Sequence, residues 1–154
     1  MSDSSGTEAV LRPARSEDLA PALALLENAG LPAAGVPEWF EHFVVAENGG
    51  RIVGLAGLEV YGTDGLLRSV AVAEDWRGRG LGGALTQEIL ALAARAGLQA
   101  VYLLTETAES FFPRHGFERI ERTAVSAAVK ASAEFRELCP ASSVVMKRAV
   151  AVTS

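Results

Sequence analysis

The chain has 154 residues, enough for a single domain with its own core, and 49% of them are apolar while 21% are charged. Its formal net charge of −5 argues against a dedicated nucleic-acid-binding protein, because contacts to phosphates need clustered lysine and arginine. The one cysteine, Cys139, excludes an intramolecular disulfide and a cysteine-based zinc cluster, and with two histidines in the chain we expect no metal site.

Neither a signal peptide nor a membrane span is predicted. The first ten residues, MSDSSGTEAV, have no basic residue and no apolar core. The apolar runs are also shorter than the roughly 20 residues that a span needs. We therefore expect a cytoplasmic protein without a membrane partner, folded as one domain over residues 1–154 with residues 1–7 disordered.

The first third of the chain predicts one strand and one long helix. AVLRPA (9–14) is typical of a short strand, and residues 16–30 predict a helix with Ser16 as its N-cap. Three leucines recur there at helical spacing: Leu19, Leu23 and Leu26. Gly30 closes the helix, and residues 38–42 predict a single helical turn.

Three strands connected by short turns follow. Residues 43–47 and 51–61 join through Asn48-Gly49-Gly50, whose residues tolerate a positive φ, and a second turn leads into LLRSVAV (66–72). Strands joined by such short turns must run antiparallel to their neighbours.

The second half of the chain alternates helices and strands. A helix of about 16 residues, ending at Gly97, is predicted to precede an apolar strand, 98–105. The remaining predicted elements are a short helix interrupted at Pro113 (108–116), a strand (117–121), a partly helical segment (123–138) and a last strand (142–148). This order predicts the α/β class, with a mixed sheet of about seven strands flanked by helices.

The stretch VAEDWRGRGLGGAL (72–85) fits two different patterns. Three of its glycines match the G-x-G-x-x-G of dinucleotide-binding folds: Gly78, Gly80 and Gly83. That pattern needs its first glycine directly after a strand, whereas five residues separate Val72 from Gly78. The antiparallel strands upstream also argue against it, so a dinucleotide cofactor is the weaker interpretation.

The alternative pattern is R-x-x-G-x-G, from Arg77 to Gly82, at the start of the following helix. Successive backbone N–H groups at a helix N-terminus bind phosphate, and glycines remove the Cβ atoms that would keep it at a distance. Arg77 and Arg79 add positive charge. A glycine-rich turn without a ligand is the plain alternative.

At these residues the chain resembles the GNAT superfamily of acyl-CoA-dependent N-acetyltransferases, whose R/Q-x-x-G-x-G/A signature is matched by Arg77, Gly80 and Gly82. The lead-in SVAVAEDWR and the segment ESFFPRHGFERI extend the resemblance over nearly the whole chain. It implies the GNAT fold, acetyl-CoA as cosubstrate, and strands 66–72 and 98–105 that run parallel and then splay around the thioester arm. The implied cofactor-binding residues are Val70, Ala71, Val72, Arg77, Gly78, Arg79, Gly80, Leu81, Gly82, Thr105 and Phe112.

Three residues are candidates for proton transfer: Glu59, Glu106 and Cys139. Glu59 interrupts an apolar run and Glu106 ends a strand, so either could act as the base, although a solvated strand-end charge is equally plausible for both. Many relatives use a tyrosine to protonate the leaving thiolate, but Phe112 takes that place here. Cys139 or a water is then the candidate acid, unless the thiolate leaves as an anion.

Arg68 is a charged residue in a predicted central strand, where it needs a partner or a wet cleft. Strand alternation places Arg68, Val70 and Val72 on one face. If that face lines the acceptor pocket, Arg68 would bind an acidic group, with Glu59 and Ser69 beside it. A structural salt bridge between Arg68 and Glu59 is the equal alternative.

Longer segments, among them LLRSVAV and AEFRELCPASSVVM, resemble the acetyltransferase domain of N-acetylglutamate synthases and, more closely, ArsN-type proteins associated with arsenic resistance. Both resemblances imply a small-molecule amine as acceptor, glutamate or a toxic glutamate-like analogue. Two alternatives stay open, an N-acetylglutamate-synthase-like enzyme and a non-catalytic acyl-CoA-binding module. A homodimer, paired through the terminal strand, is also possible.

Overall fold

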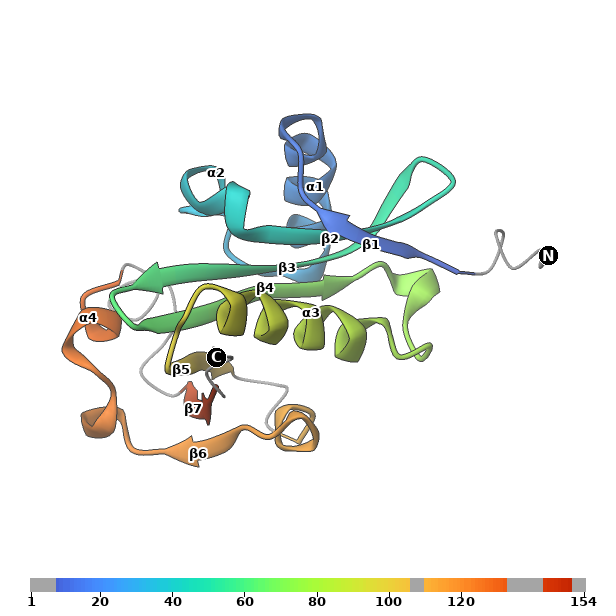
Figure 1. Ribbon diagram of the computed structural model, residues 1–154. Helices are drawn as coiled ribbons and strands as arrows, with labels where there is room; N and C mark the ends of the chain where they lie inside the picture. The colour runs from blue at the N-terminus through green and yellow to red at the C-terminus, as the bar shows by residue number, and fades with distance from the viewer. Residues whose placement is uncertain (1–7, 106–109, 133–142, 151–154) are drawn as a thin grey trace. The chain divides into compact units, whose positions relative to one another are not determined.

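The computed structural model describes residues 8–105, 110–132 and 143–150. Within them, seven strands form one mixed sheet flanked by helices, with hydrogen-bonded neighbours in the order β1-β2-β3-β4-β5-β7-β6, which confirms the predicted class (Figure 1). The strands are β1 (Val10–Pro13), β2 (Phe43–Asn48), β3 (Arg51–Tyr61), β4 (Asp64–Val72), β5 (Ala100–Thr105), β6 (Glu118–Ile120) and β7 (Val144–Ala149). The helices are α1 (Leu19–Ala29), α2 (Val36–Trp39), α3 (Leu81–Arg95) and α4 (Ala127–Lys130).

The chain divides into two compact units. The first contains residues 1–57 and 69–89, and the second contains residues 58–68 and 90–154. β3, β4 and α3 each contribute residues to both units, so the chain passes from one to the other inside regular elements.

The core of the first unit forms between α1 and the strands β2 and β3. Leu26 of α1 is fully buried, while Leu19 and Leu23 pack against the cluster from half-buried positions. Val45 and Leu55, which are partners in the antiparallel β2–β3 ladder, are also fully buried in it. Burying each such side chain stabilises the fold by about 1.5–3 kcal/mol, so the helical spacing of the leucines is what fixes α1 on this face.

The start of α1 differs by one residue from the prediction. A 3-10 turn, Ser16–Asp18, precedes the helix, and the extended residue in front of it is Arg15, with φ −116° and ψ 163°. The Arg15 N–H donates to the Asp18 carboxylate at 2.8 Å. The prediction of Ser16 as N-cap is therefore wrong, because the side chain that satisfies the first N–H reaches back from Asp18.

The β2–β3 connection is a two-residue turn. Asn48 and Arg51 are still partners in the ladder, so only Gly49 (φ 59°) and Gly50 (φ 84°) lie in the turn. Both have the left-handed conformation that such tight hairpins require and that glycine adopts without strain. The predicted antiparallel hairpin is confirmed.

Close packing of α3 against β3 also depends on a glycine. A Cβ added at Gly54 would lie 2.9 Å from Leu85 Cδ1 and 3.2 Å from Leu81 Cδ2. Both leucines belong to α3, so the absence of a side chain at Gly54 lets the helix lie directly on the strand.

In the second unit, β5 pairs with β4 on one side and with β7 on the other. The β4–β5 ladder is parallel and joins residues 64–66 to residues 100–102, whereas both β7 ladders, to β5 and to β6, are antiparallel. The apolar cluster here includes Leu66, Tyr102 and Val145. Within the chain, β7 has a strand on each side, β5 and β6 (Figure 1). Pairing of the terminal strand across a dimer interface stays a prediction.

The regular alternation of β4 is interrupted at Ser69, whose φ is +63°. No other non-glycine residue in the described ranges has a positive φ. Side-chain alternation holds only for continuous extended backbone. The prediction that Arg68, Val70 and Val72 share one face therefore fails: Arg68 is buried, while Val70 and Val72 are half-buried.

The segment after β5 contains shorter helices than predicted. Residues Phe112–His115 form a 3-10 turn with Pro113 in its first positions, so the proline starts the turn and does not interrupt it. Of the segment predicted to be partly helical, the structure describes a 3-10 turn at Arg122–Ala124 and the helix α4. Residues 133–138 of that segment, like residues 1–7, lie outside the described ranges.

Candidate functional site

The glycine-rich loop joins β4 to α3 in the first unit. Gly78 (φ 82°) and Gly80 (φ 80°) are left-handed, and a Cβ added at either would meet no protein atom within 4 Å. The Gly80 carbonyl accepts the first helical hydrogen bond, from Ala84 N at 3.1 Å. Glycine is thus required at both positions by the backbone conformation, and the space beside them is open at the start of a helix, where N–H groups have no helical partner.

This arrangement distinguishes the two patterns that the sequence fits. A 3-10 turn, Glu74–Trp76, lies between the end of β4 and Gly78. In a dinucleotide-binding fold the first glycine follows the strand directly, so the loop does not have that geometry. Its open, left-handed glycines at a helix start fit a phosphate-bearing ligand. Gly82, the third glycine predicted to lie near the ligand, is the second residue of α3.

Two arginines of the loop are held by the protein itself. Arg77 Nε donates to the carbonyl of Val72 at 3.2 Å. The Arg79 guanidinium lies 4.5 Å from the centre of the Trp76 ring, which is 7% exposed. A cation over an aromatic face is attracted by the ring quadrupole. These contacts hold the two arginine side chains against the loop and keep two positive charges next to it.

An ion pair connects this loop to the β2–β3 hairpin. Arg51 donates twice to the Asp75 carboxylate, from Nη1 at 2.8 Å and from Nη2 at 3.0 Å. These hydrogen bonds are the main cause that lowers the pKa of Asp75, and the positive charge of Arg79 lowers it further. Asp75 therefore stays ionised, with its charge opposed by Arg51.

The Arg51–Asp75 pair lines a pocket of about 760 Å³. It is lined by the C-terminal end of α1, including Asn28, by Arg51, and by residues 72–75 together with Arg77. Two residues predicted to bind the cofactor, Val72 and Arg77, thus face the same pocket as the Arg51–Asp75 pair. Of the other β4 residues predicted there, Ala71 is buried.

In the second unit, Glu59 and Arg68 form a buried ion pair. Arg68 Nη1 donates to Glu59 Oε2 at 2.7 Å, and the two side chains are only 1% and 4% exposed. The Tyr61 hydroxyl donates to the other oxygen, Oε1, of Glu59. The structural salt bridge that the sequence left as an alternative is confirmed, and both oxygens of the candidate base have partners.

Thr105 and Phe112 occupy different surroundings in the second unit. Thr105 is the half-buried last residue of β5. Phe112 is 6% exposed and packs edge-on against two aromatic rings, with its ring centre 4.9 Å from that of Phe111 and 5.7 Å from that of Phe117. Phe112 therefore belongs to an aromatic cluster.

Two of the three candidate proton-transfer residues, Glu106 and Cys139, lie outside the described residues. In the described part of the chain, no three histidine, cysteine or acidic side chains gather to hold a metal ion. No helix there is long and apolar enough to cross a bilayer.

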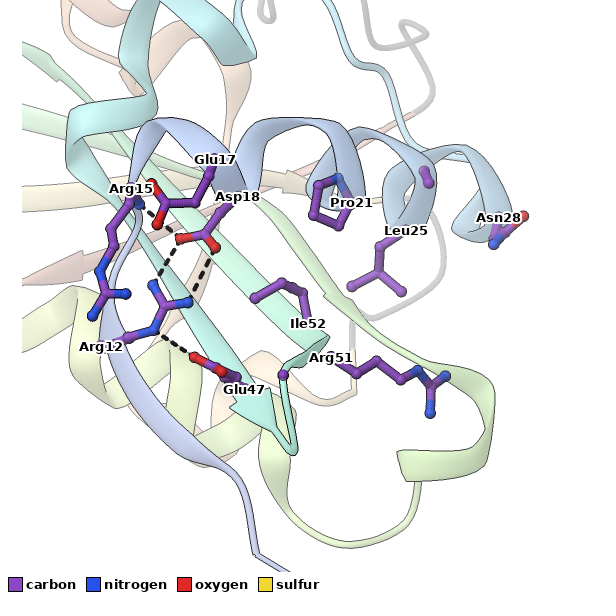
Figure 2. Close-up of a pocket in the computed structure, with 12 residues that line it drawn as sticks. Arg12, Arg15, Glu17, Asp18, Pro21, Leu25, Asn28, Glu47, Arg51 and Ile52 are labelled. Atoms are coloured by element: carbon purple, nitrogen blue, oxygen red, sulfur yellow. Dashed lines mark hydrogen bonds and ion pairs between the residues drawn. The ribbon is translucent and has the colours of Figure 1, made fainter.

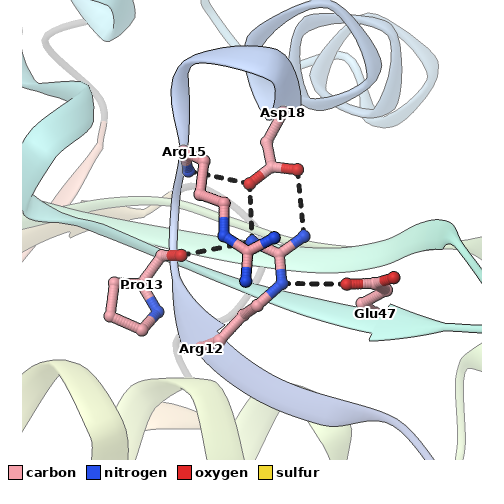
Figure 3. Close-up of polar contacts among 5 residues, drawn as sticks. All are labelled: Arg12, Pro13, Arg15, Asp18 and Glu47. Atoms are coloured by element: carbon pink, nitrogen blue, oxygen red, sulfur yellow. Dashed lines mark hydrogen bonds and ion pairs between the residues drawn. The ribbon is translucent and has the colours of Figure 1, made fainter.

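A second charged cluster in the first unit was not predicted from the sequence. Arg12 donates to both oxygens of Asp18, from Nη1 at 2.7 Å and from Nη2 at 3.0 Å, and its Nε donates to Glu47 at 2.8 Å (Figure 3). The hydrogen bonding from Arg12 is the main cause that lowers the pKa of Asp18, and the Arg15 N–H lowers it further. The six-residue spacing of Arg12 and Asp18 is the only local signal, and it fits no standard pattern.

The Arg12 cluster lines a second pocket, of about 630 Å³. Figure 2 shows Arg12 bonded to both Asp18 and Glu47 on one side of this pocket, while the Arg51 side chain points away from them. The guanidinium of Arg12 therefore already has protein partners. The residues that line this pocket do not include the left-handed glycines before α3.

Comparison with known proteins agrees with the geometry of the loop. A family model for an acetyltransferase (GNAT) domain matches residues 39–119. The amino-acid acetyltransferase of Mycobacterium tuberculosis is 41% identical over 106 residues, which cover 66% of this chain and 58% of that protein. An uncharacterized N-acetyltransferase of Chlorobaculum tepidum is 31% identical over 86 residues, 55% of each chain. The matches thus span little more than half the length of these curated relatives.

Solved structures extend the similarity over nearly the whole chain. A Mycobacterium tuberculosis protein in complex with CoA and NLQ is 29% identical, with a TM-score of 0.79, and the match covers 92% of this chain and 99% of that one. The N-acetylglutamate synthase of Neisseria gonorrhoeae, complexed with coenzyme A and N-acetyl-glutamate, is 20% identical, with a TM-score of 0.80 over 93% of this chain and 35% of that one. At 20% identity, the similarity to the Neisseria gonorrhoeae enzyme shows that the two proteins share a fold.

Proposed function

Because the chain belongs to the GNAT acetyltransferase family, we propose that it is an acetyl-CoA-dependent N-acetyltransferase that acts on the amine of a small molecule. The observation that carries the proposal is the loop before α3, where Gly78 and Gly80 are left-handed and open on the side where a Cβ would stand. Such a loop lets a pyrophosphate approach the N–H groups at the helix start.

We propose that the cofactor lies along β4 and the loop. Pairing of β4 with β5 ends at Leu66, and the strand continues to Val72. This supports main-chain contacts from Val70, Ala71 and Val72 to the thioester arm. The pyrophosphate would then be bound by the loop residues Arg77, Gly78, Arg79, Gly80, Leu81 and Gly82. Thr105 and Phe112 complete the proposed cofactor residues.

The proposed reaction is direct attack of the amine on a thioester, which acetyl-CoA supplies when bound. A base takes one proton from the ammonium, and the free amine attacks, so that a C–N bond forms and the C–S bond breaks. The nitrogen then releases a second proton, and the CoA thiolate leaves, protonated by an acid or as an anion. Glu59, Glu106 and Cys139 remain the proposed proton-transfer residues. For Glu59, a direct role would require a partner change, because Arg68 and Tyr61 already donate to its two oxygens.

We propose an acidic amino acid, or a toxic glutamate-like analogue, as the acceptor. The similarity to an amino-acid acetyltransferase supports the amino-acid class, and the resemblance to ArsN-type proteins suggests detoxification. Arg68, with Ser69 and Glu59 beside it, is the proposed reader of the acidic group. Since Nη1 of Arg68 donates to Glu59, any acceptor carboxylate must share the guanidinium with that residue.

Thiol release from acetyl-CoA, measured against a panel of amino acids and glutamate analogues, tests this function. We expect release with an acidic amino acid, and loss of CoA binding in the G80V variant, whose side chain would be strained at φ 80°. Release with glutamate alone would favour an N-acetylglutamate-synthase-like enzyme. Binding of acetyl-CoA without release on any amine would support the non-catalytic module instead.

We also propose that residues 1–154 act as one catalytic domain in the cytoplasm, with no nucleic-acid or membrane partner. The passage of β3, β4 and α3 through both units supports a single domain, because no linker separates them. A homodimer remains part of the proposal, and light scattering on the purified chain would measure its mass.

A further inference from the structure

Asp75 places a negative charge where the proposed function requires the protein to bind a highly anionic cofactor. It lies two residues before Arg77, the first residue of the glycine-rich loop, and its side chain is 61% exposed. Asp75 lines the same pocket as Val72 and Arg77, both proposed cofactor residues. An ionised carboxylate there repels phosphate groups.

Arg51 opposes this charge from another part of the chain. It begins β3 directly after the Gly49-Gly50 turn, and its guanidinium forms a two-pronged pair with Asp75 at 2.8 and 3.0 Å. Arg51 lines the pocket as well. The main chain of the loop is held separately, because Ala73 N donates to Val53 O at 2.8 Å and the Trp76 ring is buried. Holding the loop in place therefore does not depend on Arg51.

We propose that Arg51 is a positioning residue for cofactor binding, which acts by neutralising Asp75 beside the glycine-rich loop. This inference rests on the proposed acetyl-CoA-binding function. With Arg51 present, Glu74 is the remaining acidic group of the pocket, and Arg77 gives the pocket wall a compensating positive charge. Without Arg51, two adjacent carboxylates would face the anionic ligand.

The pair is too exposed to matter much for folding, which makes its binding role separable. Exposed ion pairs add little to stability, because water competes for both partners, and the Arg51 side chain is 57% exposed. A charge near a ligand several ångströms away still changes affinity in water by a few-fold. Variants at this pair should therefore fold normally and differ in binding.

Calorimetric titration of CoA into wild type, R51A, D75N and R51A/D75N tests the inference. We expect R51A to weaken CoA binding about fivefold at low salt, and the double variant to return to near the wild-type affinity. R51K should also bind like wild type, because it keeps the charge. The R51A deficit should shrink at 0.5 M salt, where charges are screened within roughly 4 Å.

The matched control is R95A, which removes the same charge from the exposed end of α3 and should leave CoA affinity unchanged. In the enzyme assay, R51A should raise the KM for acetyl-CoA without changing kcat. Unchanged binding by R51A, or a double variant as weak as R51A, would overturn the inference alone. Failure of the wild-type chain to bind CoA would overturn the proposed function and this inference together.

Discussion

Two guanidinium–carboxylate clusters, one in each unit, use the same chemistry in different surroundings. In the first unit, Arg12 is shared between Asp18 and Glu47, and the three side chains are 15%, 6% and 33% exposed. In the second unit, Glu59 is shared between Arg68 and Tyr61, and the ion pair is almost completely enclosed. One cluster is centred on a cation that water can reach, and the other on an anion that it cannot.

The two clusters should differ in how well they tolerate the loss of a partner. At the partly exposed Arg12 cluster, water and the remaining partners compensate in part for a lost partner, so the cost of losing one is moderate. In the interior, the charge left behind has no substitute, and its desolvation is uncompensated. Removing one member of the Glu59–Arg68 pair should therefore lower stability strongly, whereas replacing both with apolar residues should lower it little. Removing one partner from the Arg12 cluster should lower stability by a smaller amount than removing Arg68.

Breaking the buried pair should have the largest effect. We expect R68M to lower the free energy of unfolding by about 3–5 kcal/mol, because it leaves Glu59 as an unpaired buried charge. Urea denaturation of the purified protein measures this. The E59L/R68M double variant removes both charges and should recover most of the loss. A single variant as stable as wild type would show that water reaches this pair.

Removing one partner of the Arg12 cluster should cost less. D18N keeps the shape of the side chain but weakens the two hydrogen bonds from Arg12 and the one from the Arg15 N–H, while Arg12 keeps its bond to Glu47. We expect a loss of about 1–3 kcal/mol in unfolding free energy. E17Q, at the exposed neighbouring position, is the matched control and should stay within about 0.5 kcal/mol of wild type. A D18N loss as large as that of R68M would remove the contrast between the clusters.

The smallest expected effect is the change in unfolding free energy with pH, which depends on the ionisation of Asp18. Hydrogen bonding from Arg12 holds the pKa of Asp18 below its ordinary value of 3.8. The stabilisation is thus fully present above about pH 4 and is lost as the pH falls through the lowered pKa of the folded protein. Denaturation of wild type and D18N between pH 7 and pH 2.5 should give curves that converge at the acid end. Parallel curves would show that Asp18 is not the titrating group.

Much of the fold follows from local patterns. The glycines at 49 and 50 require a left-handed turn, the leucine spacing of residues 19–26 requires a helix, and the apolar run at 98–105 requires a buried strand, so all three elements were predictable. The predictions failed where a single residue departs from the regular pattern. Ser69 is such a residue, because nothing in LLRSVAV signals its positive φ.

The candidate site was predictable to the same extent. Gly78 and Gly80 were identified because the positive φ of a cradle and the glycine that permits it are properties of one short segment. Arg51, Asp75 and Asn28 were missed because they come from three separate elements and meet only in the pocket. No spacing within the sequence connects them.

The helices, strands and turns, and the glycine-rich loop before α3, were predictable from local sequence patterns, since each depends on residues close together in the chain. The pairing of charges depended on the tertiary fold. Two interpretations of Arg68 were equal until the fold placed its Nη1 atom 2.7 Å from Glu59 Oε2. No partner was predicted for Arg12 or Arg51, because their partners come from other elements. The physical reason is that backbone conformation is set by neighbours in sequence, whereas an ion pair is set by how distant strands and turns align.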